Sequence, residues 1–259
     1  MAAGCAAQGA PGGGAIGLMG DTPYTEREAE RLEQLIDDIN AAPLAFVVHV
    51  GDIGRPREAC TDAWLEARKR QFARIRHPFV LLPGDNEWTD CRNQVERLDA
   101  WRKMFCSTSL KVERQGGPFC EHVRWEMEGL VFVTLNVQGS NNNVGRPEEF
   151  GPRMAAVYAW LDEAARIAAL RKGLVVMMQA NPFISLPRDG YVVLREKLLS
   201  LGEKMPGRVV LVHGDTHLWH DDEPLPGVRR IEVWGSPIVS WLRVPLAGGE
   251  LGVSAPRHR

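Results

Sequence analysis

The 259-residue sequence lacks several features that would place it in a class directly. It has no run of about 20 apolar residues, so we expect no membrane-spanning helix. Its 31 Lys and Arg residues nearly balance its 33 Asp and Glu residues, which argues against the basic surface that binds duplex nucleic acid. Glycine (26) and proline (17) interrupt the chain throughout and exclude a long coiled coil. Hydrophobic residues make up 44% of the chain, enough for a globular core.

Cysteine is scarce, and no two cysteines have the C-x-x-C spacing of a zinc knuckle or a thioredoxin motif. Cys5 lies in an Ala/Gly-rich segment, residues 1–14, that we expect to be a flexible tail. Ala2-Ala3-Gly4-Cys5 looks like the end of a lipoprotein cleavage box, so a lipid anchor at Cys5 and an incidental cysteine are both open. We predict an exported protein, periplasmic or at the cell surface, with a cytoplasmic protein holding free thiols as the alternative.

Strand-like apolar runs alternate with amphipathic stretches, which predicts an α/β fold with largely parallel central strands. The expected strands are 16–19, 45–50, 79–82, 130–136, 174–178, 209–212, 230–234 and 239–244, and the expected helices are 26–40, 59–75, 95–105, 154–170 and 191–201. From His217 onward there is no room for helices, so the last strands should be antiparallel. We predict one domain over residues 15–246, followed by a polar C-terminal tail, 247–259.

The dipeptide Gly-Asp occurs four times, where chance pairing would give about one. Each copy follows an apolar run, and the four aspartates are Asp21, Asp52, Asp85 and Asp215. Four carboxylates would therefore lie at the carboxyl ends of four strands, the edge at which open α/β sheets bind ligands. Glycine before each aspartate lets the backbone turn sharply and lets another group approach the backbone closely.

Carboxylates gathered at one edge repel each other by several kcal/mol per pair at about 4 Å, and divalent cations are the simplest compensation. The alternative is that each aspartate separately caps the helix that follows it. His217 favours the metal interpretation, because Asp215 and His217 would point to the same side of an extended segment.

The order of these motifs resembles that of the calcineurin-like metallophosphoesterases, D-x-H, G-D, G-N-H-[DE], a strand-end His and G-H-x-H, over about residues 16–220. The resemblance implies a four-layer α/β/β/α sandwich with mixed sheets, and two metals whose bridging hydroxide attacks phosphorus. Asp21 takes the place of the first ligand, and Asp52 that of the carboxylate that bridges both metals. Glu87 keeps the acidic position, and His217 keeps the last histidine.

Five positions depart from the family pattern. Pro23 replaces the histidine of D-x-H, Asp85 stands in place of an Asn ligand, and Asn86 stands in place of the histidine that protonates the leaving group. Gln179 replaces a ligand histidine, and Asp215 replaces the first histidine of G-H-x-H. The implied metal ligands are thus Asp21, Asp52, Asp85, Gln179, Asp215 and His217. This oxygen-rich set favours Mn²⁺ or Mg²⁺, with Fe, Ca²⁺ and Zn²⁺ as alternatives.

The catalytic residues implied by the resemblance are Asp52 and Asn86. The candidates for binding a phosphate are Asn86, Arg55 and Arg146, although both arginines could equally be surface charge. The run Asn141–Asn143 is typical of a turn, with a binding loop as the alternative. Without a histidine at position 86, we expect slow hydrolysis except with good leaving groups, or else an enzyme in which another residue supplies the general acid.

We hypothesise two disulfides, because Cys60 and Cys91 each lie several residues past a Gly-Asp pair and Cys106 lies near Cys120 in the chain. A Cys60–Cys91 bond would brace two loops of the site, and a Cys106–Cys120 bond would close a short loop. We therefore expect a metal-dependent phosphatase or phosphodiesterase acting on a small phosphoester. The alternative is a catalytically weak or inactive metal-binding member of the same fold that binds a ligand or a partner.

Overall fold

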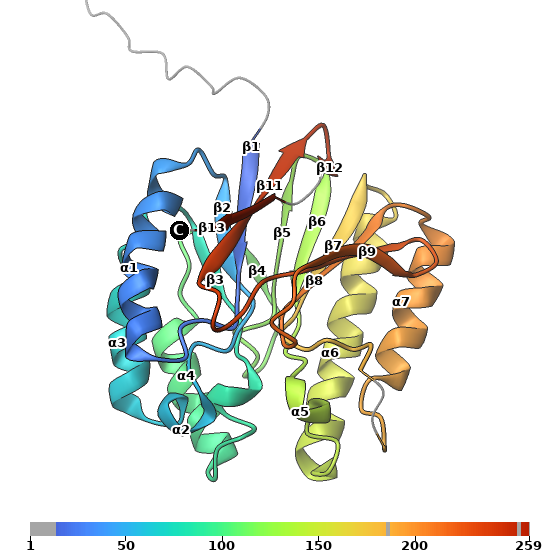
Figure 1. Cartoon of the computed structure of the whole chain (residues 1–259). Coiled ribbons are helices and arrows are strands. Elements are labelled where there is room, and N and C mark those ends of the chain that lie inside the picture. The colour runs from blue at the N-terminus through green and yellow to red at the C-terminus, as the bar shows by residue number, and fades with distance from the viewer. Residues whose placement is uncertain (1–13, 185–186, 253–254, 259) are drawn as a thin grey trace, which may run out of the picture.

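The computed structural model describes residues 14–184, 187–252 and 255–258. Two mixed β-sheets lie face to face between two groups of helices (Figure 1). Cys5 and nearly all of the expected N-terminal tail lie outside the described residues, so the lipid anchor stays a prediction.

The first sheet has the strand order β12-β11-β1-β2-β3, with β13 also paired to β11. The strands β1, β2 and β3 are parallel, and β11 is antiparallel to β1. Their bounds are β1 Gly14–Met19, β2 Phe46–His49, β3 Phe79–Leu81, β11 Ser240–Ala247, β12 Glu250–Leu251 and β13 Ala255–His258. Part of the segment expected to be a C-terminal tail therefore extends this sheet, because β12 and β13 both pair with β11.

The second sheet has the order β4-β5-β6-β7-β8-β10-β9. Its strands are β4 Glu113–Arg114, β5 Val123–Met127, β6 Leu130–Thr134, β7 Gly173–Met177, β8 Val209–His213, β9 His220–Leu225 and β10 Val228–Glu232. The expectation that all the last strands are antiparallel is wrong for β10, which is parallel to β8. The reason is that β9 runs along the outer edge and its hairpin partner β10 lies between β9 and β8.

The helices are α1 Glu26–Ala41, α2 Pro56–Ala59, α3 Asp62–Phe72, η1 Asp85–Glu87, α4 Gln94–Phe105, α5 Gly139–Asn142, α6 Pro147–Ala168 and α7 Val192–Lys204. In α1 the predicted apolar face, Ala29, Leu32, Leu35, Ile36 and Ile39, is buried. The Thr25 hydroxyl begins this helix by accepting from the N–H of Glu28 at 3.2 Å. Helix α6 begins earlier than predicted, since Pro147 fits the first turn of a helix.

Three hydrophobic layers confirm the four-layer α/β/β/α sandwich. The helices α1, α3 and α4 cover the first sheet, and α6 and α7 cover the second (Figure 1). Their apolar side chains pack on these sheets, and a third apolar layer lies between the two sheets. Neighbouring residues of one strand face different layers: Val47 faces the helices, whereas Phe46 and Val48 face the other sheet. Central strands buried on both faces explain the continuous apolar runs in the sequence.

Both expected disulfides are present in the structure, Cys60–Cys91 and Cys106–Cys120. Both sulfur atoms of the first bond lie against the carbonyl oxygen of Asn86, at 3.8 Å and 3.6 Å. No helix among the described residues is long and apolar enough to cross a membrane.

Each disulfide should stabilise the fold, because it removes entropy from the unfolded chain. Replacing either pair by serine should lower the free energy of unfolding by about 3 kcal/mol, measured by urea denaturation. Loss of Cys60–Cys91 should also weaken metal binding, because that bond contacts Asn86, whereas loss of Cys106–Cys120 should not. Unfolding free energies equal to that of the wild type in both variants would contradict this expectation.

Candidate metal centre

The candidate metal centre is built at the carboxyl ends of strands from both sheets. Asp21, Asp52 and Asp85 follow β1, β2 and β3 of the first sheet, while Gln179 and Asp215 follow β7 and β8 of the second. Parallel strands deliver their carboxyl ends to one edge, so residues far apart in the chain meet there.

Hydrogen bonds connect these segments directly. The backbone N–H of Asp215 donates to both carboxylate oxygens of Asp21 at 3.1 Å. The backbone N–H of Asn86 donates to Asp52 Oδ1 at 3.2 Å. Gln179 Nε2 donates to Asp52 Oδ2 at 3.1 Å, which joins the second sheet to the first.

The glycine of one Gly-Asp pair packs against the aspartate of another. A Cβ atom on Gly84 would lie 1.9 Å from Asp52 Oδ1, and one on Gly214 would lie 2.0 Å from Asp21 Oδ2. No larger residue fits at either position. The Gly-Asp pair is therefore repeated because each carboxylate lies against the backbone of another pair, and only glycine leaves room for it there.

The backbone of the site is strained. Asp21, Asp52, Asp215 and His217 have φ values of 49°, 60°, 83° and 63°. The left-handed region is costly for residues with a side chain, and such outliers cluster at functional sites.

Burial makes the negative charges costly. Asp21, Asp52 and Asp85 are buried. Burial raises the pKa of Asp85 to about 6, and burial together with Asp85 raises the pKa of Asp215 to about 7. Burial and the neighbouring carboxylates also raise the pKa of Asp21 and of Asp52. The fully ionised cluster thus needs positive charge close by.

Glu87 holds two loops of the site together. Its carboxylate accepts from the backbone N–H groups of Gly84 at 2.6 Å, Ile53 at 2.5 Å and Asp52 at 3.3 Å. The side chain is fully buried, and burial raises the pKa of Glu87 to about 7. Glu87 therefore fixes the backbone around Asp52 and Asp85.

Neutral polar groups lie between the carboxylates. Gln179 Oε1 accepts from the N–H of Gly139 at 2.5 Å, which directs its NH₂ group toward Asp52. The Tyr24 hydroxyl donates to Asp52 Oδ2 at 3.0 Å and accepts from Asn86 Nδ2 at 2.9 Å. These groups separate the charges and satisfy part of their hydrogen bonding.

His217 faces this cluster from the second sheet. Its Nε2 atom lies 3.2 Å from the Tyr24 hydroxyl and 3.8 Å from Asp21 Oδ1. Its Nδ1 atom lies 2.7 Å from the carbonyl oxygen of Ser236. A carbonyl only accepts, so Nδ1 carries a proton and donates it, which leaves Nε2 directed at the site.

The donor chemistry fits hard divalent cations, since carboxylate oxygens predominate. Asp85 Oδ1 is buried without a hydrogen-bond partner, an orphan that a cation would satisfy. A group of three or more His, Cys, Asp or Glu side chains could hold an ion as it stands if their ligand atoms all lay within 4.8 Å of one another. Among the described residues, only Cys106, Cys120 and Glu121 form such a group, and both sulfurs there belong to a disulfide. The aspartates are thus spaced more widely than a closed coordination shell, and their side chains must move inward to hold an ion.

Solved structures share this architecture. A dimetal phosphatase from Danio rerio is similar with a TM-score of 0.63 and 12% identity, covering 95% of this chain and 98% of that one. This chain has the calcineurin-like metallophosphoesterase fold. GAP50, the anchor in the inner membrane complex of Plasmodium, matches with a TM-score of 0.60 and 11% identity over 96% of this chain and 89% of that chain. A purple acid phosphatase from yellow lupin matches with a TM-score of 0.53 and 12% identity over 95% of this chain and 54% of that chain. No protein-family model and no curated protein matches the sequence.

Within the metallophosphoesterase fold, the candidate phosphate-binding residues lie in different surroundings. Asn86 is buried beside the cluster, and its amide also donates to the carbonyl of Gly54 at 2.9 Å. Arg55 and Arg146 are exposed. In the described part of the chain, neither guanidinium has a hydrogen bond or an ion pair with the cluster, so their role stays a prediction.

The Asn141–Asn143 run forms a left-handed turn. Ser140 and the three asparagines have φ values between 48° and 58°. Asparagine tolerates this region better than most residues. Asn141 binds the carbonyls of Pro187 and Arg188 through its amide, and Asn142 accepts from Arg153 at 2.7 Å. The turn is therefore held by its own side chains.

Two side chains of the site, Ser140 and Tyr24, were not predicted from the sequence. The Ser140 hydroxyl donates to Asp85 Oδ2 at 2.7 Å, and the Tyr24 hydroxyl lies among Asp52, Asn86 and His217. Ser140 gave no sequence signal. Tyr24 gave a weak one, since it follows Pro23 directly at the position of a missing ligand.

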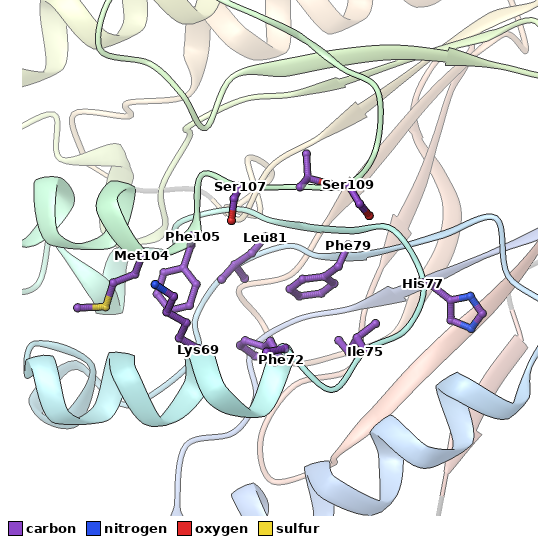
Figure 2. A pocket seen from close by; sticks show the side chains of 12 residues that line it. Lys69, Phe72, Ile75, His77, Phe79, Leu81, Met104, Phe105, Ser107 and Ser109 are labelled. Atoms are coloured by element: carbon purple, nitrogen blue, oxygen red, sulfur yellow. The ribbon is translucent and has the colours of Figure 1, made fainter.

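A separate hollow of about 330 Å³ lies beside β3, between the C-terminal parts of α3 and α4 (Figure 2). Phe72, Phe79 and Phe105 line it together with Lys69 and His77. None of the acidic residues above lines this hollow, so it does not belong to the candidate metal centre.

Proposed function

We propose that the protein is a metal-dependent phosphoester hydrolase. One observation carries the proposal: three buried aspartates of the first sheet meet Gln179 and Asp215 of the second at the strand ends of a metallophosphoesterase fold. Full ionisation of this cluster is compatible with burial only when cations balance its charge. The proposed substrate is a small phosphoester.

Two ligand sets account for the cluster. Asp21, Asp52 and His217 would hold one ion. Asp52, Asp85 and Asp215 would hold the other, with Asp52 shared by both. Gln179 would join this second set once its amide turned to present Oε1 in place of the NH₂ group that faces Asp52. Mn²⁺ or Mg²⁺ suits these oxygen-rich sets. When bound, such ions polarise a phosphate ester and lower the pKa of a coordinated water.

The side chains of this chain would orient the substrate more than they would transfer protons. The Asn86 amide is directed at Tyr24 and Gly54, and an amide supplies no proton to a leaving group. Arg55 and Arg146 are proposed to bind the phosphate after moving toward the cluster. Hydrolysis should therefore depend strongly on the quality of the leaving group.

We also propose that the protein is exported. Disulfides persist in oxidising compartments, and two of them are present here.

A second candidate function is metal or ligand binding without turnover. Tyr24 and Gln179 fill the space between the carboxylates with hydrogen bonds, and position 86 has no histidine. Both features favour a site that binds without protonating a leaving group.

Purified protein with Mn²⁺ should hydrolyse bis-p-nitrophenyl phosphate and should lose this activity with a chelator. Esters with alkyl leaving groups should react about 10²–10⁴-fold more slowly, because the general acid is absent. Elemental analysis of the same sample measures the bound metal. Bound metal without turnover of either ester would favour the second candidate, and a protein that binds no divalent ion would contradict both.

A further inference from the structure

The ion proposed to bind Asp21, Asp52 and His217 has one ligand fewer than in the family pattern. Pro23 occupies the place of the family histidine and offers no side-chain donor. Asp21, Asp52 and His217 are left to hold that ion. The next residue along the chain, Tyr24, places its hydroxyl beside these side chains.

The Tyr24 oxygen lies between two of the three candidate ligands. It is 3.0 Å from Asp52 Oδ2 and 3.2 Å from His217 Nε2, and His217 Nε2 is 3.8 Å from Asp21 Oδ1. Short distances therefore connect four side chains in space, in the order Asp21, His217, Tyr24 and Asp52. Among the described residues, no three Asp, Glu or His side chains of this site have ligand atoms all within 4.8 Å of one another, and the Tyr24 oxygen lies between two of them.

The contact between Tyr24 and neutral His217 lacks a proton. The Tyr24 hydroxyl gives its single proton to Asp52 Oδ2 and accepts from Asn86 Nδ2. In the neutral imidazole, Nδ1 donates to the carbonyl oxygen of Ser236 and Nε2 turns a lone pair toward the Tyr24 oxygen. This contact is then between two lone pairs, which a shared ion would satisfy.

The protein anchors Tyr24 and His217 through one buried carboxylate. Glu28 Oε2 accepts from the backbone N–H of Tyr24 at 2.7 Å, and Glu28 Oε1 accepts from the Ser236 hydroxyl at 2.9 Å. Ser236 in turn accepts from His217. The Tyr24 ring also packs edge-on against the His217 ring, with centroids 5.1 Å apart. Such supporting contacts are typical of residues that orient metal ligands.

We propose that the hydroxyl oxygen of Tyr24 is a ligand of the metal ion held by Asp21, Asp52 and His217, in place of the missing histidine. The inference rests on the proposed metal-dependent function. On binding, the O–H bond of Tyr24 breaks, an oxygen–metal bond forms, and the proton passes to the buffer. The resulting set of three oxygen donors and one nitrogen favours a hard ion.

A phenolate bound to Fe³⁺ gives a visible charge-transfer band, which tests the assignment without any activity assay. Protein loaded with Fe²⁺ and oxidised in air should become coloured, and Raman scattering excited in the band should show tyrosine ring vibrations. Tyr24→Phe should lose the band and should bind Mn²⁺ about 10–100-fold more weakly. Tyr158→Phe, on α6 beside Lys197, is the matched control and should keep both properties.

Iron-loaded wild-type protein without a tyrosine band would overturn the ligand assignment and leave the metal site itself in place. A band that persists in Tyr24→Phe would overturn it as well. Protein that takes up neither iron nor Mn²⁺ would overturn the proposed function together with this inference. Because the Raman readout uses the wild-type protein, a Tyr24→Phe variant that fails to fold does not prevent the test.

Discussion

Asp52→Asn should reduce the metal-dependent hydrolysis more than about 100-fold, since losing even an outer-shell partner of a metal costs about 10–100-fold. The Asp52 carboxylate accepts from Asn86, Gln179 and Tyr24, which belong to different loops. It is also the one carboxylate proposed to contact both ions. Asparagine keeps the size of the side chain but presents an NH₂ group to donors that need an acceptor. Initial rates with bis-p-nitrophenyl phosphate and elemental analysis measure the loss.

This variant should lose function without losing its fold. Removing one charge from a buried acidic cluster relieves repulsion, so the metal-free variant should melt at the wild-type temperature or above it. Asp162→Asn is the matched control, because Asp162 is exposed on α6 and pairs with Lys197 on α7. It should keep full activity and metal content. An Asp52→Asn protein with normal activity would show that the reactive centre lies elsewhere.

The layered fold was accessible from the sequence because its strands are buried on both faces. Val47 and Val48 face different layers and are both apolar, so a continuous apolar run marks the strand. The Gly-Asp pairs were equally visible, since Gly84 and Gly214 each admit the aspartate of another motif. These signals are local in the sequence, although they permit contacts between residues that are far apart in the sequence.

Other features depend on tertiary pairing and had a weak local signal or none. The apolar pattern predicts a strand over 230–234 but none over β9, and it does not reveal that β10 pairs with β9 on one side and with β8 on the other. The Ser140 hydroxyl reaches Asp85 because a left-handed turn follows β6, and no periodicity encodes that turn. Tyr24 enters the site from the loop after β1, where a single aromatic residue is normally read as packing.

The metal-free protein should become less stable as the pH rises from 6.5 to 8.5. Glu87 and Asp215 have folded pKa values of about 7, well above those of the unfolded chain, so the folded state holds the extra protons. The stability that they contribute is complete at low pH and is lost as the pH passes through 7, by about 2 kcal/mol for the two groups together. His49, His122 and His213, whose pKa values are lowered to about 4, 4 and 3, act in the opposite direction only below about pH 6.5.

Divalent metal should reverse this trend, because it binds the ionised carboxylates. At 1,000 times its dissociation constant, one Mn²⁺ ion adds about 4 kcal/mol at pH 8.5. The gain should shrink at pH 5, where protons compete for the same oxygens. Urea denaturation measures the free energy of unfolding at each pH, once with Mn²⁺ and once with NaCl of equal ionic strength. A gain seen with Mn²⁺ but not with NaCl comes from binding of the ion and not from charge screening. Asp52→Asn should lack most of the Mn²⁺ effect. A Mn²⁺ stabilisation independent of pH would mean that the ion binds outside the acidic cluster, and the buried carboxylates would then need another source of positive charge.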